Sequence, residues 1–187
     1  MFYSSGQYRA AKFAAALPAV DKRVLLLNGF AMIVVDLRAA LIDAERELRG
    51  LYESLPARDP LPIGTSASGF LAVWDRINEH SKAARKLIGE TVADRDIMAL
   101  QQIVFGALAE FERIIGPHFK YLDEMASATD EKSMIIPAVR AEMIFKLHPD
   151  TLSLIAVQRL KLEAVTENLS ITFSQAQEQR ERIVREI

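Results

Sequence analysis

The sequence predicts an all-α protein, a single domain over residues 1–187 built as an up-down four-helix bundle with two long helices and a small helical cap. Two observations predict this class. Apolar residues recur at spacings of three and four, the period of a helix rather than the alternation of a strand. The chain also has 187 residues, 50% of them hydrophobic and 26% charged, a composition typical of one folded domain.

The first predicted helix covers residues 5–17 and stops at Pro18, because proline lacks an amide donor and disfavours helical geometry in the residue before it. A long second helix is expected over residues 19–55. Its apolar residues alternate steps of three and four, which is a heptad seam. The seam runs in phase through Gly29 and Gly50, so we expect one continuous helix. Its members are Leu27, Phe30, Val34, Leu37, Leu41, Ala44, Leu48, Leu51 and Leu55.

A proline-rich stretch over residues 56–64 predicts a loop. The third helix is then expected over residues 66–88, with Gly89 placed to end it. Its stripe toward the core is expected to contain Leu71, Trp74, Ile77, Ala84 and Leu87 or Ile88.

A fourth helix is predicted over residues 94–115, because Thr91 or Asp94 can cap its start and the Gly-Pro pair at 116–117 stops it. Its apolar stripe repeats at helical spacing. The members of this stripe are Ile97, Leu100, Val104, Ala107, Phe111 and Ile114.

The cap is expected over residues 118–149, as two short helices covering 118–128 and 138–147. Asp150 then provides an N-cap for a last long helix that runs to Ile187. The expected seam of this helix is Ile155, Leu162, Val165, Leu169, Phe173, Ala176, Ile183 and Ile187. Two long and two medium helices with a cap favour the up-down bundle.

Charge and composition exclude several classes of function. The chain has 23 basic and 25 acidic residues, so it lacks the clustered cations that nucleic-acid binding requires. It has no cysteine, which fits either a reducing cytosol or a bacterial periplasm. The most apolar run, 24–35, is flanked on both sides by charges and is shorter than a membrane span, so we expect a buried helix segment.

No constellation in the sequence predicts catalysis, a metal or a cofactor. The Glu-x-x-His step of carboxylate-bridged metal bundles is missing, and the segment 64–69 lacks the lysine of a phosphate loop. The three histidines, His80, His118 and His148, are expected at the surface or as caps. We therefore expect no enzyme.

Arginines placed near the inner face of a bundle suggest an anion site. If the long helices run antiparallel, Arg46 falls near Arg159, and Arg76 and Trp74 lie at a similar depth. These four could hold a small carboxylate, nitrate or phosphate, since guanidinium groups bind such anions in bidentate geometry. Arg38, expected near Glu167 and Asn168, is a second candidate. The alternative is that the arginines are ordinary surface residues with ion-pair partners such as Glu45, Glu47 or Asp75.

Three segments resemble the extracytoplasmic helical sensory domains of bacterial methyl-accepting chemotaxis proteins. They are residues 5–11 (SGQYRAA), 17–21 (LPAVD) and 177–183 (QEQRERI). The resemblance implies a ligand-sensing homodimer in the periplasm, attached to the inner membrane only through flanking spans outside this segment. A last helix that keeps its seam to Ile187 agrees with an excised domain. The Glu-Arg-Gly motif of related nitrate sensors is absent, because Leu48 precedes Arg49-Gly50, so nitrate recognition is not implied.

A second reading stays open, namely a cytoplasmic, non-enzymatic helical adaptor or scaffold. Such a protein needs only exposed helical seams. The two readings differ in what the parent gene encodes, because a receptor has apolar spans of roughly 20 residues on either side of this segment.

Overall fold

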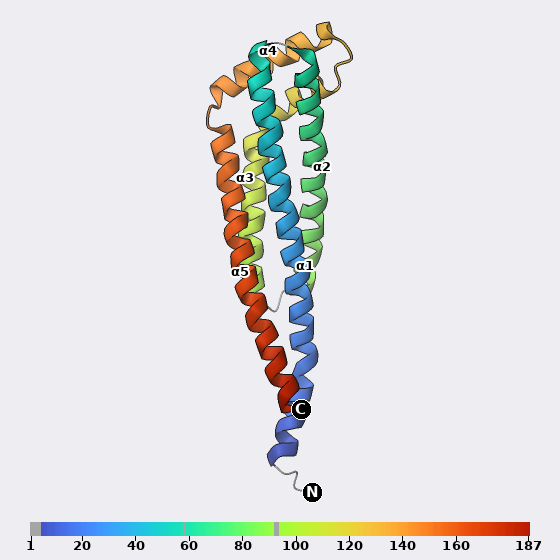
Figure 1. Cartoon of the computed structure of the whole chain (residues 1–187), viewed down its shortest axis with the longest axis vertical. Helices are drawn as coiled ribbons and strands as arrows, with labels where there is room; N and C mark the ends of the chain where they lie inside the picture. The colour runs from blue at the N-terminus through green and yellow to red at the C-terminus, as the bar shows by residue number, and fades with distance from the viewer. Residues whose placement is uncertain (1–4, 58, 92–93) are drawn as a thin grey trace.

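The computed structural model describes residues 5–57, 59–91 and 94–187, and within these ranges the chain is helical almost throughout and contains no strand. The all-α prediction is confirmed. The elements are α1 (Ser5–Ser54), a short 3-10 turn (Leu55–Ala57), α2 (Pro60–Thr91), α3 (Arg95–Ala126), α4 (Glu131–Leu147) and α5 (Thr151–Glu186). Helices α1, α2, α3 and α5 lie side by side along the long axis, and α4 lies across one end (Figure 1).

Helices α1 and α5 pack together in opposite directions. Two ion pairs fix their register: Arg38 Nη2 lies 3.2 Å from Glu163 Oε1, and Arg180 Nε lies 2.6 Å from Asp21 Oδ1. The residue on α1 with the higher number thus pairs with the residue on α5 with the lower number, so the two helices are antiparallel. Both helices reach the end of the molecule opposite α4 (Figure 1), where Arg9 Nε of α1 lies 3.5 Å from Glu186 Oε2 of α5.

The heptad seam of α1 forms the centre of the core, as predicted. Every predicted member from Leu27 to Leu55 is buried, and the helix is continuous through Gly29 and Gly50. A heptad repeat keeps one stripe facing its neighbours over many turns. This stripe fixes which side of α1 faces α2 and α5.

Two predicted helix breaks at proline are wrong. Pro18 lies inside α1, and Pro117 lies inside α3, which therefore includes the first predicted cap helix. Each proline removes one backbone hydrogen bond to the carbonyl four residues earlier. Pro18 and Pro117 are both exposed, as are Ala14 and Arg113, which carry those carbonyls. Water can solvate both carbonyls, so packing on either side keeps each helix intact.

Two predicted helix starts are also wrong. Helix α2 begins at Pro60 rather than at residue 66, because prolines in the first turn remove only amide donors that have no partner within the helix. Helix α4 begins at Glu131 rather than at residue 138, and Asp130 and Ser133 form a capping box at its start. Helix α4 thus covers the second predicted cap helix and seven residues before it.

The inner stripe of α2 is displaced from the prediction. Leu71 and Trp74 are only half-buried, whereas Phe70 and Val73 are buried together with Ile77. Helix α2 packs between α1 and α3, so it buries a broader face than one seam. Helix α2 also runs past Gly89 to Thr91. The side chain of Ile88 lies outside the described residues.

The α5 seam is largely confirmed. Six of its eight predicted members are buried. Phe173 is half-buried and Ile187 is exposed. The buried members are Ile155, Leu162, Val165, Leu169, Ala176 and Ile183. Asp150 lies at the N-cap position, but its side chain makes no capping hydrogen bond.

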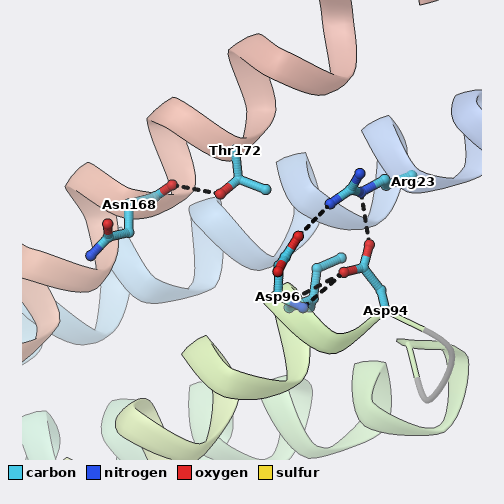
Figure 2. Close-up of polar contacts among 6 residues, drawn as sticks. Arg23, Asp94, Asp96, Asn168 and Thr172 are labelled. Carbon is cyan, nitrogen blue, oxygen red and sulfur yellow. Dashed lines mark hydrogen bonds and ion pairs between the residues drawn. The ribbon is translucent and has the colours of Figure 1, made fainter. Parts of the chain in front are cut away.

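The start of α3 is tied to α1 by Arg23 (Figure 2). Asp94, one of the two predicted caps, accepts hydrogen bonds through Oδ1 from the backbone amides of Asp96 and Ile97. Arg23 Nε lies 2.8 Å from Asp94 Oδ2, and Arg23 Nη2 lies 3.0 Å from Asp96 Oδ2. These contacts hold the α3 N-terminus against α1.

Candidate functional site

A groove with a volume of about 320 Å³ lies where α1 and α5 meet, toward the α4 end of the molecule. We call it the arginine groove. Its lining residues come from two turns of α1 and one position of α5. They are Ile42, Glu45, Arg46, Arg49 and Arg159.

Glu45 lies between two of the three arginines. Arg49 Nη2 lies 3.0 Å from Glu45 Oε1, and Arg159 Nε lies 3.5 Å from Glu45 Oε2. The second distance is too long for a strong charge-assisted hydrogen bond. Glu45 therefore pairs with two of the three guanidinium groups, and it is the one carboxylate among the lining residues.

Arg46 also contacts acidic residues outside the groove. Its Nη2 lies 3.1 Å from Asp43 Oδ1 and 3.2 Å from Glu47 Oε1. Asp43 in turn pairs with Arg76 of α2 at 2.6 Å. Arg46 is more exposed than Arg159. Guanidinium groups suit the geometry of an oxyanion, and Arg159 is the least exposed of the three in the groove.

The structure brings together only part of the predicted anion site. Arg46 and Arg159 line one groove, as the antiparallel arrangement predicts. Trp74 packs instead on two rings of α3, Phe111 and Phe119, with ring centroids 5.8 and 5.2 Å apart.

The other two predicted arginines have ion-pair partners outside the groove. Arg76 pairs with Asp43. Arg38 pairs with Glu163 rather than with Glu167 or Asn168, one turn earlier on α5 than predicted. Each of the four predicted arginines therefore has a carboxylate partner, as the alternative interpretation expected.

Sequence reasoning missed Arg49 and Glu45 as lining residues. Arg49 lies three residues after Arg46 and four after Glu45, spacings that place all three side chains on adjacent rows of one helix surface. That spacing was a signal available in the sequence.

The position of His118 also differs from the prediction. The sequence predicts a surface or capping histidine, but His118 lies inside α3 and is buried, 2% exposed. Its ring stacks on Phe145 of α4, with centroids 4.5 Å apart. Its Nε2 lies 3.1 Å from Thr151 Oγ1, at the start of α5. Because α3 continues through Pro117, His118 enters the core instead of ending a helix.

Burial, together with a smaller effect of the nearby His148, lowers the pKa of His118 from 6.5 to about 4. Thr151 Oγ1 donates to the backbone carbonyl of His148 at 2.7 Å, so it can only accept from His118 Nε2. The neutral ring therefore carries its proton on Nε2. Its Nδ1 is buried, with no hydrogen-bond partner in the described part of the chain.

A larger groove of about 590 Å³ separates α2 from the α3–α4 connection. Its lining is mostly small or apolar, and its charged member is Asp130. Asp130 is already engaged as the cap of α4, where a backbone hydrogen bond from Ser133 is the main reason that the pKa of its carboxyl is lowered. This groove offers no cation for an anion.

Two further observations bear on the site. The described residues contain no group of three or more His, Cys, Asp or Glu side chains placed to hold a metal ion. The segment Gln7–Ala57 is long and apolar enough to cross a membrane by length and composition, but a core helix of a soluble protein passes the same test. About a third of its most apolar stretch is buried.

Comparisons of the chain with protein-family models, with curated proteins and with solved structures find no match.

Proposed function

We propose that the protein is a ligand-sensing extracytoplasmic domain of a bacterial membrane receptor, an up-down helical bundle that binds a small anion in the arginine groove. One observation carries this proposal: three arginines on two different long helices share a groove with a single carboxylate. Anion binding there contacts α1 and α5 at once, and both helices run to the same end of the molecule.

The groove suggests how binding becomes a signal. A bound carboxylate, nitrate or phosphate competes with Glu45 for Arg159, whose Nε lies 3.5 Å from Glu45 Oε2. Tightening one helix against its neighbour moves it by an ångström or two, which is a known form of signalling movement. Helix α5 can pass such a shift along its length to the opposite end.

The same proposal sets the protein's place and partners. It lies in the periplasm, attached to the inner membrane through flanking spans, and acts as a homodimer without catalysis, cofactor or nucleic acid. The resemblance of the three short segments to chemotaxis receptors supports this assignment, as does the balanced net charge.

A thermal-shift screen with acetate, nitrate and phosphate at constant ionic strength tests the proposal. An anion that binds only the folded state raises the melting temperature. We expect at least one anion to stabilise the wild type and to lose most of this effect in Arg159→Ala. Arg113→Ala is the matched control, because Arg113 is an exposed arginine with one carboxylate partner on α3, outside the groove. Equal stabilisation of all three proteins would exclude Arg159 from the site.

The second candidate function is a cytoplasmic helical adaptor, and the exposed apolar residues of α1 and α5 favour it. An adaptor needs no anion and no membrane. The full reading frame separates the two functions, since only the receptor requires apolar spans of roughly 20 residues before and after these helices.

A further inference from the structure

A groove with a volume of about 390 Å³ lies between α2 and α3, apart from the two grooves described above. We call it the α2–α3 groove. Its apolar floor comes from one face of α3, because residues three and four apart lie on the same side of a helix. The floor residues are Phe105, Leu108 and Ala109. The volume lies in the range of small-ligand sites, which is about 300–1,000 Å³.

Two exposed side chains of opposite charge complete the lining of the α2–α3 groove. Arg85 comes from α2, and Glu112 comes from the same face of α3 as the floor. Neither side chain makes an ion pair with a residue that the structure describes, and the two do not pair with each other. Arg113, next to Glu112, shows the contrast, because it pairs with Glu110 at 2.6 Å. The groove therefore offers both a cation and an anion to a ligand.

The two charges of the α2–α3 groove come from different heights on the bundle. Trp74 of α2 packs on Phe111 and Phe119 of α3. Glu112 follows Phe111, so it lies near the height of Trp74. Arg85 lies eleven residues after Trp74 on α2, which is about 16 Å along the helix axis at a rise of about 1.5 Å per residue. Because both side chains line one groove, their charged groups come closer than this, to on the order of 10 Å.

A ligand that meets both charges must be a zwitterion whose own charges are a similar distance apart. A free amino acid is too short, because one Cα atom carries both its ammonium and its carboxylate. An extended peptide rises about 3.3 Å per residue, so three residues span on the order of 10 Å. Its carboxylate can then pair with Arg85, whose guanidinium binds carboxylates in bidentate geometry, while its ammonium pairs with Glu112.

We propose that the α2–α3 groove binds a short apolar peptide of about three residues with free amino and carboxyl termini. The side chains of the peptide pack on the floor, where Phe105 is half-buried and Ala109 is exposed. Its backbone amides face water above the groove and keep their hydrogen bonds there, so the apolar floor leaves no polar group unpaired. The site is separate from the arginine groove and binds a different class of ligand.

A short peptide fits the α2–α3 groove better than a partner protein does. Five residues line the groove, whereas a stable protein interface takes about 20–30 residues on each side. The two charges of a short peptide are its termini, which a segment inside a longer chain lacks. The charges of Arg85 and Glu112, one at each end of an apolar floor, therefore favour a small ligand with charged ends.

Isothermal titration calorimetry with tri-alanine at constant ionic strength tests the proposal. We expect tri-alanine to bind the wild type saturably. Free alanine, N-acetyl-tri-alanine and tri-alanine amide should each bind at least tenfold more weakly, because each can meet only one of the two charges in the groove. Derivatives that bind as tightly as tri-alanine would overturn the proposal, and so would the absence of saturable binding of tri-alanine up to millimolar concentration.

Two substitutions assign each end of the peptide to its residue. Arg85→Gln should bind tri-alanine and its amide equally, because the carboxylate has lost its partner. Glu112→Gln should bind tri-alanine and its N-acetyl form equally. Both residues are exposed, so circular dichroism should be unchanged. Lys82→Gln is the matched control, since Lys82 is an exposed cation of α2 outside the groove, and it should bind tri-alanine like the wild type.

Arg159→Ala separates the peptide site from the arginine groove, and this variant should bind tri-alanine like the wild type. Loss of peptide binding in Arg159→Ala would place the carboxylate in the arginine groove and overturn the proposal. Equal weakening by Lys82→Gln and Arg85→Gln would do the same, because it would reflect overall charge. Failure of the peptide site does not decide whether the arginine groove binds acetate, nitrate or phosphate, which the thermal-shift screen measures separately.

Discussion

The imidazole Nε2 of His118 lies 3.1 Å from the hydroxyl of Thr151, and this contact ties α3 to the first residue of α5. The hydroxyl proton goes to the carbonyl of His148, so the histidine must donate. A second proton on the ring would sit on Nδ1, which is buried and has no acceptor among the described residues. The junction of α3, α4 and α5 therefore favours the neutral form of the histidine.

This relationship predicts a loss of stability in acid. The pKa of His118 is about 4 when folded and 6.5 in the unfolded chain, because burial disfavours the charged ring. The stabilisation is fully present above pH 6.5 and declines as the pH falls from 6.5 through 4. By linkage the total loss is roughly 3 kcal/mol. The measurement is urea unfolding at several pH values between 7 and 4.

His118→Gln is the control for this titration, since glutamine can still donate to Thr151 but does not ionise. The stability of the variant should fall less steeply over this interval, with only the carboxylates contributing. Parallel curves for wild type and variant would show that His118 is protonated as easily in the folded as in the unfolded protein.

Gly106→Ala should stabilise α3 by about 0.5–1 kcal/mol. A Cβ at this position meets no atom within 4 Å, and alanine reduces the entropy of the unfolded chain. Gly69→Ala should gain less or lose stability, because its Cβ would lie 2.7 Å from Glu47 Oε2. Denaturant unfolding of both variants checks the difference, and a larger gain at Gly69 than at Gly106 would contradict the close packing of α1 on α2.

The link between Arg23 and the start of α3 should contribute about 1 kcal/mol and weaken with salt. Arg23 contacts both Asp94 and Asp96, and all three are at least partly exposed. A double-mutant cycle of Arg23→Ala and Asp96→Ala, at low and high ionic strength, measures their coupling. A coupling energy of zero at low salt would mean that the pair in Figure 2 does not stabilise the fold.

Leu41→Asp should destabilise the protein by several kcal/mol, because it buries an unpaired charge at the centre of the α1 seam. Ala72→Asp on the exposed side of α2 introduces the same charge in the middle of another helix and should cost far less. Chemical denaturation compares them. Similar stabilities would mean that the seam of α1 is not the core.

Much of this fold follows from periodicity. The α1 seam was predictable residue by residue because a strict heptad repeat leaves one choice of inner face. The errors fell at prolines, since the effect of Pro18 or Pro117 depends on whether water can reach the carbonyl four residues earlier. That is a property of the packed molecule, and local sequence does not contain it.

The candidate site was predictable only in part. Arg46 and Arg159 came together because antiparallel helices of known length set their relative height. Trp74 did not join them, because depth along a bundle does not say which neighbour a side chain faces, and the broad inner face of α2 turned Trp74 toward α3. The burial of His118 was missed for a related reason, since it required α3 to pass through Pro117.

The central claim is that the arginine groove binds a small anion, and arginine side-chain NMR during titration with acetate tests it most directly. At constant ionic strength, the Nε–Hε signals of Arg159, Arg46 and Arg49 should shift and saturate together. Signals of Arg38 and Arg113, which lie outside the groove, should stay in place. Shifts that grow linearly and equally at all arginines, or that saturate first at Arg38, would contradict the account.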